Sequence, residues 1–328
     1  MKKRVLLFWL SIAVSVVILS SCPAVQREKE TLTFAFVPGI TDPFYYTMER
    51  GILEKTQELG INLLIAEYPK TWGAEAQIPV LESIVLQGDI DLILIAPASV
   101  DALITPLKKL HEQGIQIITV DTFIGDGDYS KESEFSFPLS YIGTDNELGG
   151  KKIAEHLAKL LGEKGKVYVS TTDTDTSSVV GRVNGFTEGI AEFPNMELVR
   201  IDYNGDVQET ARIQTLAALQ QHPDIVGVFG VNVFSAQGAY RAIVDAGLTG
   251  AVKIATWDAT KDLINALKEG QVDLVLAQKP AEMGTLAVEW GYKFFTEQAQ
   301  VPKKVIPGFE FFTRENVDNP DMQQFMYH

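Results

Sequence analysis

The chain has 328 residues, of which 46% are hydrophobic and 22% charged, and its formal net charge is −15 at pH 7. This length and composition are typical of a globular protein with two ordinary domains. The acidic balance disfavours a nucleic-acid partner because phosphate backbones would be repelled, and a single cysteine, Cys22, excludes a disulfide framework.

The first 21 residues carry the pattern of an export signal. Three basic residues at positions 2–4 precede 15 uncharged residues at positions 5–19, and a Leu-Ser-Ser-Cys tetrad ends at Cys22. As a helix this stretch would rise about 22 Å, less than the roughly 30 Å of a hydrocarbon core. The tetrad resembles a bacterial lipobox, which implies cleavage of residues 1–21, acylation of Cys22 and a tether over residues 22–30. A plain signal peptide or a tilted anchor helix is the alternative, and each of them places the rest of the chain outside the cytoplasm.

Short β-rich runs alternate with helical periodicity from residue 32 onward. The first half predicts strands over 32–36, 62–66, 91–96 and 116–120, and helices over 44–59, 76–87 and 100–113. The later strands are nearly all apolar, which is typical of parallel strands with helices on both faces. Gly60, Gly88 and Gly114 follow the three helices and are expected to end each one in a left-handed conformation. We therefore expect a doubly wound α/β unit.

The same pattern then repeats. The second half predicts strands over 166–170, 197–201, 225–229 and 251–256, and helices over 179–191, 207–221 and 235–246. In each half an aspartate follows the fourth strand, Asp121 in one and Asp258 in the other. Open α/β sheets bind ligands at the carboxyl ends of their strands. Two similar lobes, each with a carboxylate at that end, are expected.

Three further elements follow, with strands over 272–277 and near 308–313 and a helix over 282–297. They are expected to cross back and complete the first lobe, and a chain that crosses several times makes a hinge. We assign residues 31–144 plus 279–309 to the first lobe and 145–278 plus 310–328 to the second. The 18 residues 123–140 form a long irregular connection, and such loops are often functional.

A series of motifs in a fixed order resembles the ribose- and galactose-binding branch of the type I periplasmic binding proteins, over essentially Leu32 to Arg314. The resemblance implies two doubly wound parallel-sheet α/β lobes that are joined by a multi-crossing hinge and bind a sugar between them, with no cofactor, metal or catalytic residue. The motifs are Asp-Pro-Phe-Tyr at 42–45, Ile-Leu-Ile-Ala-Pro-Ala at 93–98, Ile-Ile-Thr-Val-Asp at 117–121, Gly-Thr-Asp-Asn-Glu-Leu-Gly-Gly at 143–150, Arg-Val-Asn-Gly-Phe at 182–186, His-Pro-Asp at 222–224, Val-Phe-Gly-Val-Asn at 228–232, Trp-Asp at 257–258 and Ala-Gln-Lys-Pro at 277–280.

The resemblance implies that aromatic rings cover the sugar. Phe44 and Trp257 would stack on it and Tyr45 would flank it. Sugar C–H groups pack favourably against the negative face of a ring, worth about 0.5–1.5 kcal/mol beyond area burial. A place in the core is the alternative for Phe44 and for Tyr45.

The resemblance also implies that acids and amides bind the sugar hydroxyls. Asp42, Asp121 and Asp258 would accept hydrogen bonds from hydroxyls, each worth about 1.5–3 kcal/mol. Asn232 and Gln278 would add amides that both donate and accept. Helix capping is the alternative for the three aspartates, and an ordinary turn is the alternative for Asn232 and Gln278.

Cations are scarce in this set. Arg182 matches the Arg-x-x-Gly-Phe motif of the family and either reaches the ligand or only locks the surrounding loop. Val180 and Thr122 stand where ribose-type members often carry arginine, and Asp42 agrees better with galactose-type receptors. With three acids and at most one arginine, an anionic ligand would be disfavoured. A neutral sugar or polyol fits, and an amine-bearing ligand is possible.

The resemblance therefore favours the substrate-binding protein of a sugar ABC importer. It would act as a monomer outside the cytoplasm, meet the membrane only through its lipid anchor, and deliver ligand to a permease and ATPase after hinge closure. A chemotaxis or quorum receptor of the same fold is an alternative. An α/β enzyme is disfavoured because the chain has no Gly-x-Gly-x-x-Gly turn, phosphate-binding loop or Gly-x-Ser-x-Gly elbow. The four histidines are scattered, so a zinc site is not expected.

Overall fold

The computed structural model describes residues 31–327. The predicted leader over residues 1–21, acylation of Cys22 and the tether over residues 22–30 lie outside the described residues. Within the described part of the chain, no helix is both long enough and apolar enough to cross a membrane.

The first sheet has six parallel strands in the order β11-β5-β4-β3-β1-β2. Phe36, on the strand next to the edge strand β2, lies opposite Ile65 on one side and Leu94 on the other. Within the run predicted over 91–96, the apolar residues Leu92–Ile95 are fully buried, as a strand covered on both faces should be. The strands of this sheet are β1 (Thr33–Val37), β2 (Asn62–Ile65), β3 (Leu92–Ile95), β4 (Gln116–Val120), β5 (Ser140–Ile142) and β11 (Lys304–Val305).

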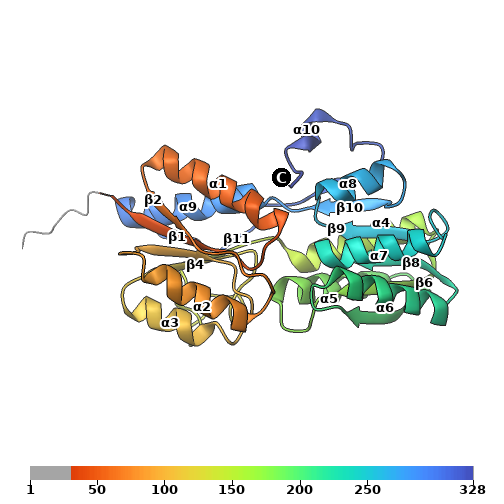
Figure 1. Cartoon of the computed structure of the whole chain (residues 1–328), viewed down its shortest axis with the longest axis horizontal. Coiled ribbons are helices and arrows are strands. Elements are labelled where there is room, and N and C mark those ends of the chain that lie inside the picture. The colour runs from red at the N-terminus through yellow and green to blue at the C-terminus, as the bar shows by residue number, and fades with distance from the viewer. Residues whose placement is uncertain (1–30, 328) are drawn as a thin grey trace, which may run out of the picture. The chain divides into compact units, whose positions relative to one another are not determined.

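Four helices cover the first sheet. Helices α1 (Pro43–Leu59) and α9 (Pro280–Glu297) lie on one face, and α2 (Ala74–Val85) and α3 (Ile104–Glu112) lie on the other (Figure 1). Gly60 and Gly114 have positive φ angles of 67° and 99°, as expected after a helix. The expectation for Gly88 is wrong, because α2 already ends at Leu86 in a right-handed conformation.

The second sheet also has six strands, in the order β12-β10-β9-β8-β6-β7, and only β12 runs antiparallel to its neighbour. This corrects the expectation that the strands over 272–277 and near 308–313 complete the first lobe. Both belong to the second sheet, because β10 extends it beside β9 and β12 adds to β10; only α9 and β11 return to the first. The strands are β6 (Lys164–Thr171), β7 (Asn195–Tyr203), β8 (Ile225–Gly230), β9 (Lys253–Trp257), β10 (Leu274–Ala277) and β12 (Glu310–Phe312).

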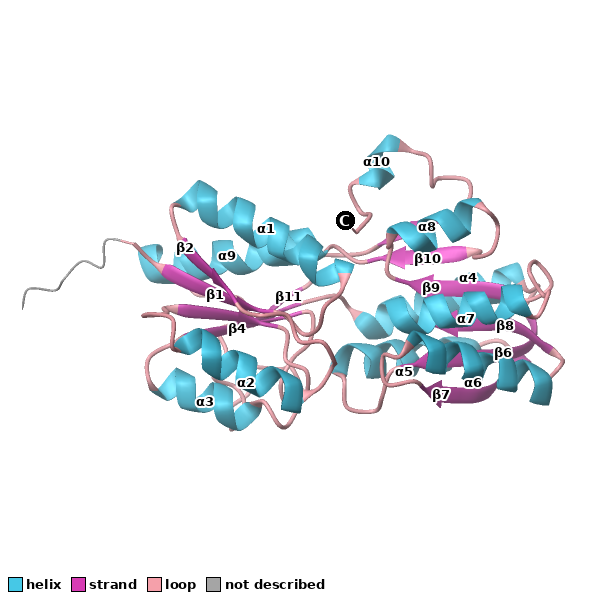
Figure 2. Cartoon of the chain, in the orientation of Figure 1, coloured by secondary structure: helices cyan, strands magenta, loops and turns pink. Residues whose placement is uncertain are grey.

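Helices again cover both faces of the second sheet (Figure 2). The sequence patterns indicated three of these helices but not α4 or α8. Helix α10 lies after β12. The helices are α4 (Asn146–Leu160) and α5 (Ser177–Ala191) on one face, α6 (Gln208–Gln221), α7 (Val233–Asp245) and α8 (Lys261–Lys268) on the other, and the short α10 (Pro320–Gln323).

We call each sheet with its helices a lobe. The chain passes between the lobes after β5, after β10 and again after β11. Thr144 and Gln278 lie on two of these crossings, and the hydroxyl of Thr144 donates a hydrogen bond of 2.7 Å to the side-chain oxygen of Gln278. Two of the segments that cross between the lobes are therefore hydrogen-bonded to each other, beside the carboxyl ends of the β-strands.

Candidate ligand-binding site

One cavity lies where the strands of both sheets end, and side chains of both lobes line it. Its empty volume, which includes space open to solvent, is about 410 Å³. Eight of the nine residues predicted to bind ligand line this cavity. They are Asp42, Phe44, Tyr45, Asp121, Arg182, Asn232, Asp258 and Gln278.

Aromatic rings form much of the first-lobe wall. Phe44 and Tyr45, in the first turn of α1, meet edge to face with ring centroids 5.1 Å apart. Trp72, just before α2, adds a third ring that sequence reasoning missed. A Cβ at Gly39 would lie 2.3 Å from the Trp72 ring, so that position must stay a glycine for the indole to reach the cavity. No sequence signal placed Trp72 here, because it lies in an irregular segment.

Two aspartates emerge from the same wall. Asp42 accepts a hydrogen bond from the backbone N–H of Phe44 (2.7 Å) and so caps α1 while it faces the cavity. Asp121 follows β4 with a φ of 61° and accepts a bond of 2.8 Å from the Tyr45 hydroxyl. Its second oxygen is buried and has no hydrogen-bond partner within residues 31–327. A ligand hydroxyl would satisfy that oxygen.

Asp258 is held from several sides in the second lobe. One of its oxygens accepts hydrogen bonds from the amide of Gln278 (2.9 Å) and from the hydroxyl of Tyr327 (3.1 Å). The other lies 4.0 Å from Nη1 of Arg182. Gln278 in turn accepts from Thr144 on another hinge crossing. The acid that faces the cavity is thus fixed to the hinge itself.

Arg182 is almost completely buried, with 3% of its surface exposed. Its Nε donates to the side-chain oxygen of Asn146 (2.9 Å), and its Nη1 donates to the carbonyl of Val231 (3.1 Å). The guanidinium therefore joins α4, α5 and the loop after β8, and it also lines the cavity. These bonds lock the surrounding segments, and contact between Arg182 and a ligand stays a prediction.

The predicted stacking of Trp257 on a ligand is corrected by the structure. Trp257 is completely buried in the core of the second lobe and does not line the cavity. Strand residues alternate between faces, and Trp257 shares with Ala255 the face that packs on α4 and α5. The Arg182 guanidinium lies 4.3 Å above its ring, so the indole supports the arginine one layer behind the cavity.

A second group that sequence reasoning missed surrounds Asp206. This aspartate follows β7 with a φ of 59° and accepts hydrogen bonds from the Thr172 hydroxyl (2.7 Å) and the Asn232 amide. Asn232 also caps α7 by accepting from the N–H of Ser235 (3.0 Å). The Asn-Gly-Asp turn at 204–206, shortly after the strand predicted over 197–201, was the signal that could have found it.

The structure shows which of the predicted site residues cap a helix. Asp42 and Asn232 are both helix caps and cavity residues. Asp258 precedes α8 but does not cap it, because Thr260 does. Asp121 opens an irregular loop rather than a helix.

The cavity has an excess of acids. Asp42, Asp121, Asp206 and Asp258 converge with one arginine as the cation in the described wall. Burial and the neighbouring Asp258 raise the pKa of Asp42 to about 8. Burial raises the pKa of Asp121 to about 6, against the opposing effects of Arg182 and Tyr45. Burial likewise raises the pKa values of Asp206 and Asp258. Such a wall disfavours an anion and suits a ligand that offers hydroxyl donors.

Among the described residues, no group of three or more His, Cys, Asp and Glu side chains is placed to hold a metal ion.

Comparison with known proteins matches this architecture. A profile described as the periplasmic binding protein domain covers residues 34–298, most of the chain. The chain belongs to the periplasmic binding protein family. The ribose import binding protein of Salmonella typhimurium is 27% identical over 281 residues, covering 85% of this chain and 90% of the relative. The D-allose-binding periplasmic protein of Escherichia coli is 27% identical over 273 residues, covering 82% and 84%.

Solved structures agree. An ABC transporter solute-binding protein of Agrobacterium vitis with bound α-D-tagatopyranose has a TM-score of 0.88 and 36% identity, covering 91% of this chain and all of that one. A second one from the same organism, with bound D-fucose, has a TM-score of 0.82 and 26% identity, covering 90% of this chain and all of that one. The two-lobed parallel-sheet fold predicted from the sequence is confirmed.

In this periplasmic binding protein the irregular connection at 123–140 does not line the cavity. The backbone N–H of Phe123 instead donates to the hydroxyl of Ser177 at the start of α5 (3.2 Å), a contact between the lobes. The loop therefore contacts the second lobe through Phe123.

Proposed function

We propose that this periplasmic binding protein is the substrate-binding component of a sugar ABC importer and that its cavity takes a neutral monosaccharide or polyol. The observation that carries the proposal is the convergence of four aspartates, two amides and four aromatic rings, including that of Phe234 at the start of α7, on one cavity with a single arginine. The rings suit the C–H faces of a sugar, and the acids suit its hydroxyls. The relatives whose names include ribose, allose, tagatopyranose and fucose support the same ligand class.

Binding would act by closing the hinge. A ligand that bonds Asp121 in one lobe and Asp258 in the other favours the arrangement in which both are within reach. A permease and its ATPase would then recognise the closed form. We take the lobes as residues 31–144 plus 279–309 and residues 145–278 plus 310–328. The protein releases the sugar chemically unchanged, as expected of a binding protein rather than an enzyme.

We propose further that the chain is exported and held at a membrane by lipid on Cys22. The lipobox-like tetrad supports this proposal. Metabolic labelling with an alkyne fatty acid should label the wild-type protein and leave Cys22→Ala unlabelled. Equal labelling of both forms would contradict lipid attachment at Cys22.

A thermal-shift screen of pentoses, hexoses and polyols tests the sugar proposal directly. At least one should raise Tm and be recovered unmodified at one molecule per protein. Asp121→Ala and Asp258→Ala should abolish the shift, while Asp318→Ala, an exposed surface acid outside the cavity, should retain it. A wild-type protein that binds none of these sugars, or that converts them, would refute the proposal.

A further inference from the structure

Tyr327 lies in the last described segment, residues 313–327, beyond the part of the chain that the family profile matches. Its backbone N–H donates to the carbonyl of Ala259 (2.9 Å), which fixes the segment beside the loop that follows β9. The side chain turns inward and is 2% exposed. It does not line the ligand cavity.

The hydroxyl of Tyr327 has two partners in the second lobe. It donates to Oδ1 of Asp258 (3.1 Å) and accepts from the backbone N–H of Gln278 (2.9 Å), so both hydrogen-bonding roles of the phenol are used. Asp258 and Gln278 are both cavity residues. The hydroxyl therefore sits directly behind the polar wall.

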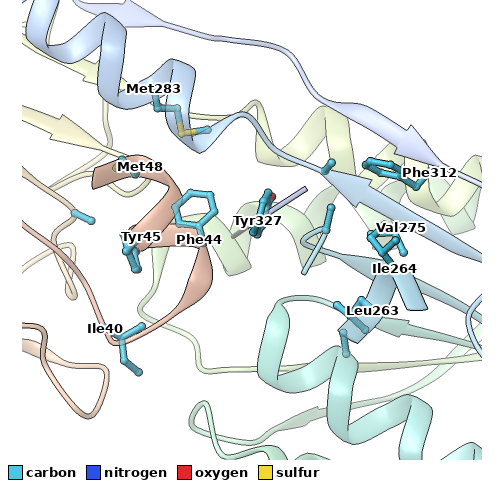
Figure 3. Packing of buried hydrophobic residues seen from close by; sticks show 14 of the residues in the cluster. Ile40, Phe44, Tyr45, Met48, Leu263, Ile264, Val275, Met283, Phe312 and Tyr327 are labelled. Carbon is cyan, nitrogen blue, oxygen red and sulfur yellow. The ribbon is translucent and has the colours of Figure 1, made fainter. Parts of the chain in front are cut away.

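The ring of Tyr327 meets the opposite wall. It lies edge to face with Phe44 of the first lobe, with centroids 5.7 Å apart at 72° (Figure 3). Phe44 is thus held between Tyr45 on its own helix and Tyr327. One side chain supports an aromatic group of one lobe and a carboxylate of the other.

We infer that Tyr327 is a positioning residue of the site, which orients Asp258 toward ligand hydroxyls and holds Phe44 against the ligand. The inference rests on the proposed sugar-binding function. Asp258 needs such a support because its residue follows the end of a strand at a φ of 76°, where no helix fixes its direction. A donated phenol proton also favours the charged carboxylate, the better acceptor for a sugar hydroxyl.

This role predicts a change in the pH dependence of binding. Several groups face Asp258: Arg182 from α5, Asp42 from the loop before α1, Asp121 from the loop after β4, and Gln278 beside Tyr327. Burial raises the pKa of Asp258, and the Tyr327 hydroxyl opposes that rise. Without the hydroxyl, the pKa of Asp258 rises further. Asp258 then takes up its proton at a higher pH, and sugar affinity falls earlier as the solution is acidified.

The test compares Tyr327→Phe with Tyr240→Phe in the full-length protein. Tyr240 is a matched control, because it is a buried tyrosine of the second lobe whose hydroxyl donates to an aspartate, Asp262 (3.0 Å), away from the cavity. D-tagatose is the probe, replaced by the sugar with the largest thermal shift if tagatose does not bind. Titration calorimetry gives Kd from pH 5 to pH 8, and Tm without sugar is measured alongside.

Tyr327→Phe should weaken affinity about tenfold at pH 7.5, with a ratio to wild type that grows as pH falls. Tyr240→Phe should keep the wild-type affinity and pH profile. Tyr327→Leu, which also loses the ring behind Phe44, should bind more weakly than Tyr327→Phe. A Tyr327→Phe protein with a lower Tm but the affinity and pH profile of wild type would overturn the inference and leave the proposed function standing. If wild type binds no sugar, both fall.

Discussion

In the first lobe the cavity wall consists of Phe44, Tyr45 and Trp72 with two aspartates, and one oxygen of Asp121 has no partner within the described residues. In the second lobe the polar groups bond to one another before any ligand arrives. Asp258 is held by Gln278 and Tyr327, Asp206 by Thr172 and Asn232, and Arg182 by Asn146 and Val231.

This contrast separates two tasks. The first-lobe wall has three aromatic rings and one unsatisfied acceptor, the second oxygen of Asp121, so it should supply affinity. The second-lobe wall is preorganised, so it should fix which hydroxyl positions are accepted. Substitutions in the first wall should mainly change affinity, and those in the second should also change the stability of the empty protein.

The largest expected effect lies in the second lobe. Arg182→Met leaves Asn146 and Asp258 without their cationic partner, and breaking a buried pair costs about 3–5 kcal/mol. Urea denaturation of the empty protein measures this loss. Arg241→Met, at an exposed pair with Asp262, should change stability by less than about 1 kcal/mol. Equal effects of the two would contradict a preorganised second wall.

Next comes Asp121→Asn, which keeps the shape and tolerates the positive φ but removes the charge. Sugar affinity should fall about 100-fold, because hydroxyl bonds to a carboxylate become bonds to a neutral amide. The empty protein should stay as stable as wild type or gain stability. Asp128→Asn on an exposed loop is the control. An unchanged sugar affinity, measured by calorimetry, would show that Asp121 does not bind the sugar.

Substitutions of Trp72 and Trp257 should change different properties, sugar affinity for the first and stability for the second. Trp72→Ala removes an apolar face from the first wall and should weaken sugar binding about 10- to 30-fold, with Trp72→Phe in between. Trp257→Leu should instead lower the unfolding free energy by about 2–4 kcal/mol, because it opens a void in the core of the second lobe. A larger loss of sugar affinity in Trp257→Leu than in Trp72→Ala would indicate that Trp257 contacts the ligand after all.

The smallest effect concerns pH. Asp42 keeps its proton up to about pH 8 in the folded protein, whereas its ordinary pKa is 3.8. The folded state therefore binds more protons in this window, and stability falls as pH rises through it. Asp42→Asn, which can still cap α1, should reduce the drop in Tm between pH 5 and pH 8 by about 3 °C. The exposed Asp318→Asn should not change that slope.

The repeating strand–helix pattern sufficed to predict two lobes, because buried parallel strands and capped helices leave local signatures. The aspartates after the fourth strands were found for the same reason. Trp257 was wrongly predicted to stack on the ligand because the Trp-Asp motif does not show on which face of the sheet the side chain lies. Trp72 and Tyr327 were missed because each reaches the site from irregular chain, through contacts that only the folded arrangement supplies. The strand over 272–277 was expected to complete the first lobe, although the lobe bounds placed it in the second, because strand pairing leaves no trace in a single sequence.

The return of α9 to the first lobe has a consequence for biosynthesis. Met283, Ala287 and Val288 of this helix cover apolar residues of the first sheet, yet they lie after the whole β6–β10 region in the chain. A growing polypeptide that stops before α9 leaves part of that face of the sheet, beside α1, uncovered. The first lobe can therefore complete its packing only after the β6–β10 region of the second lobe has been synthesised.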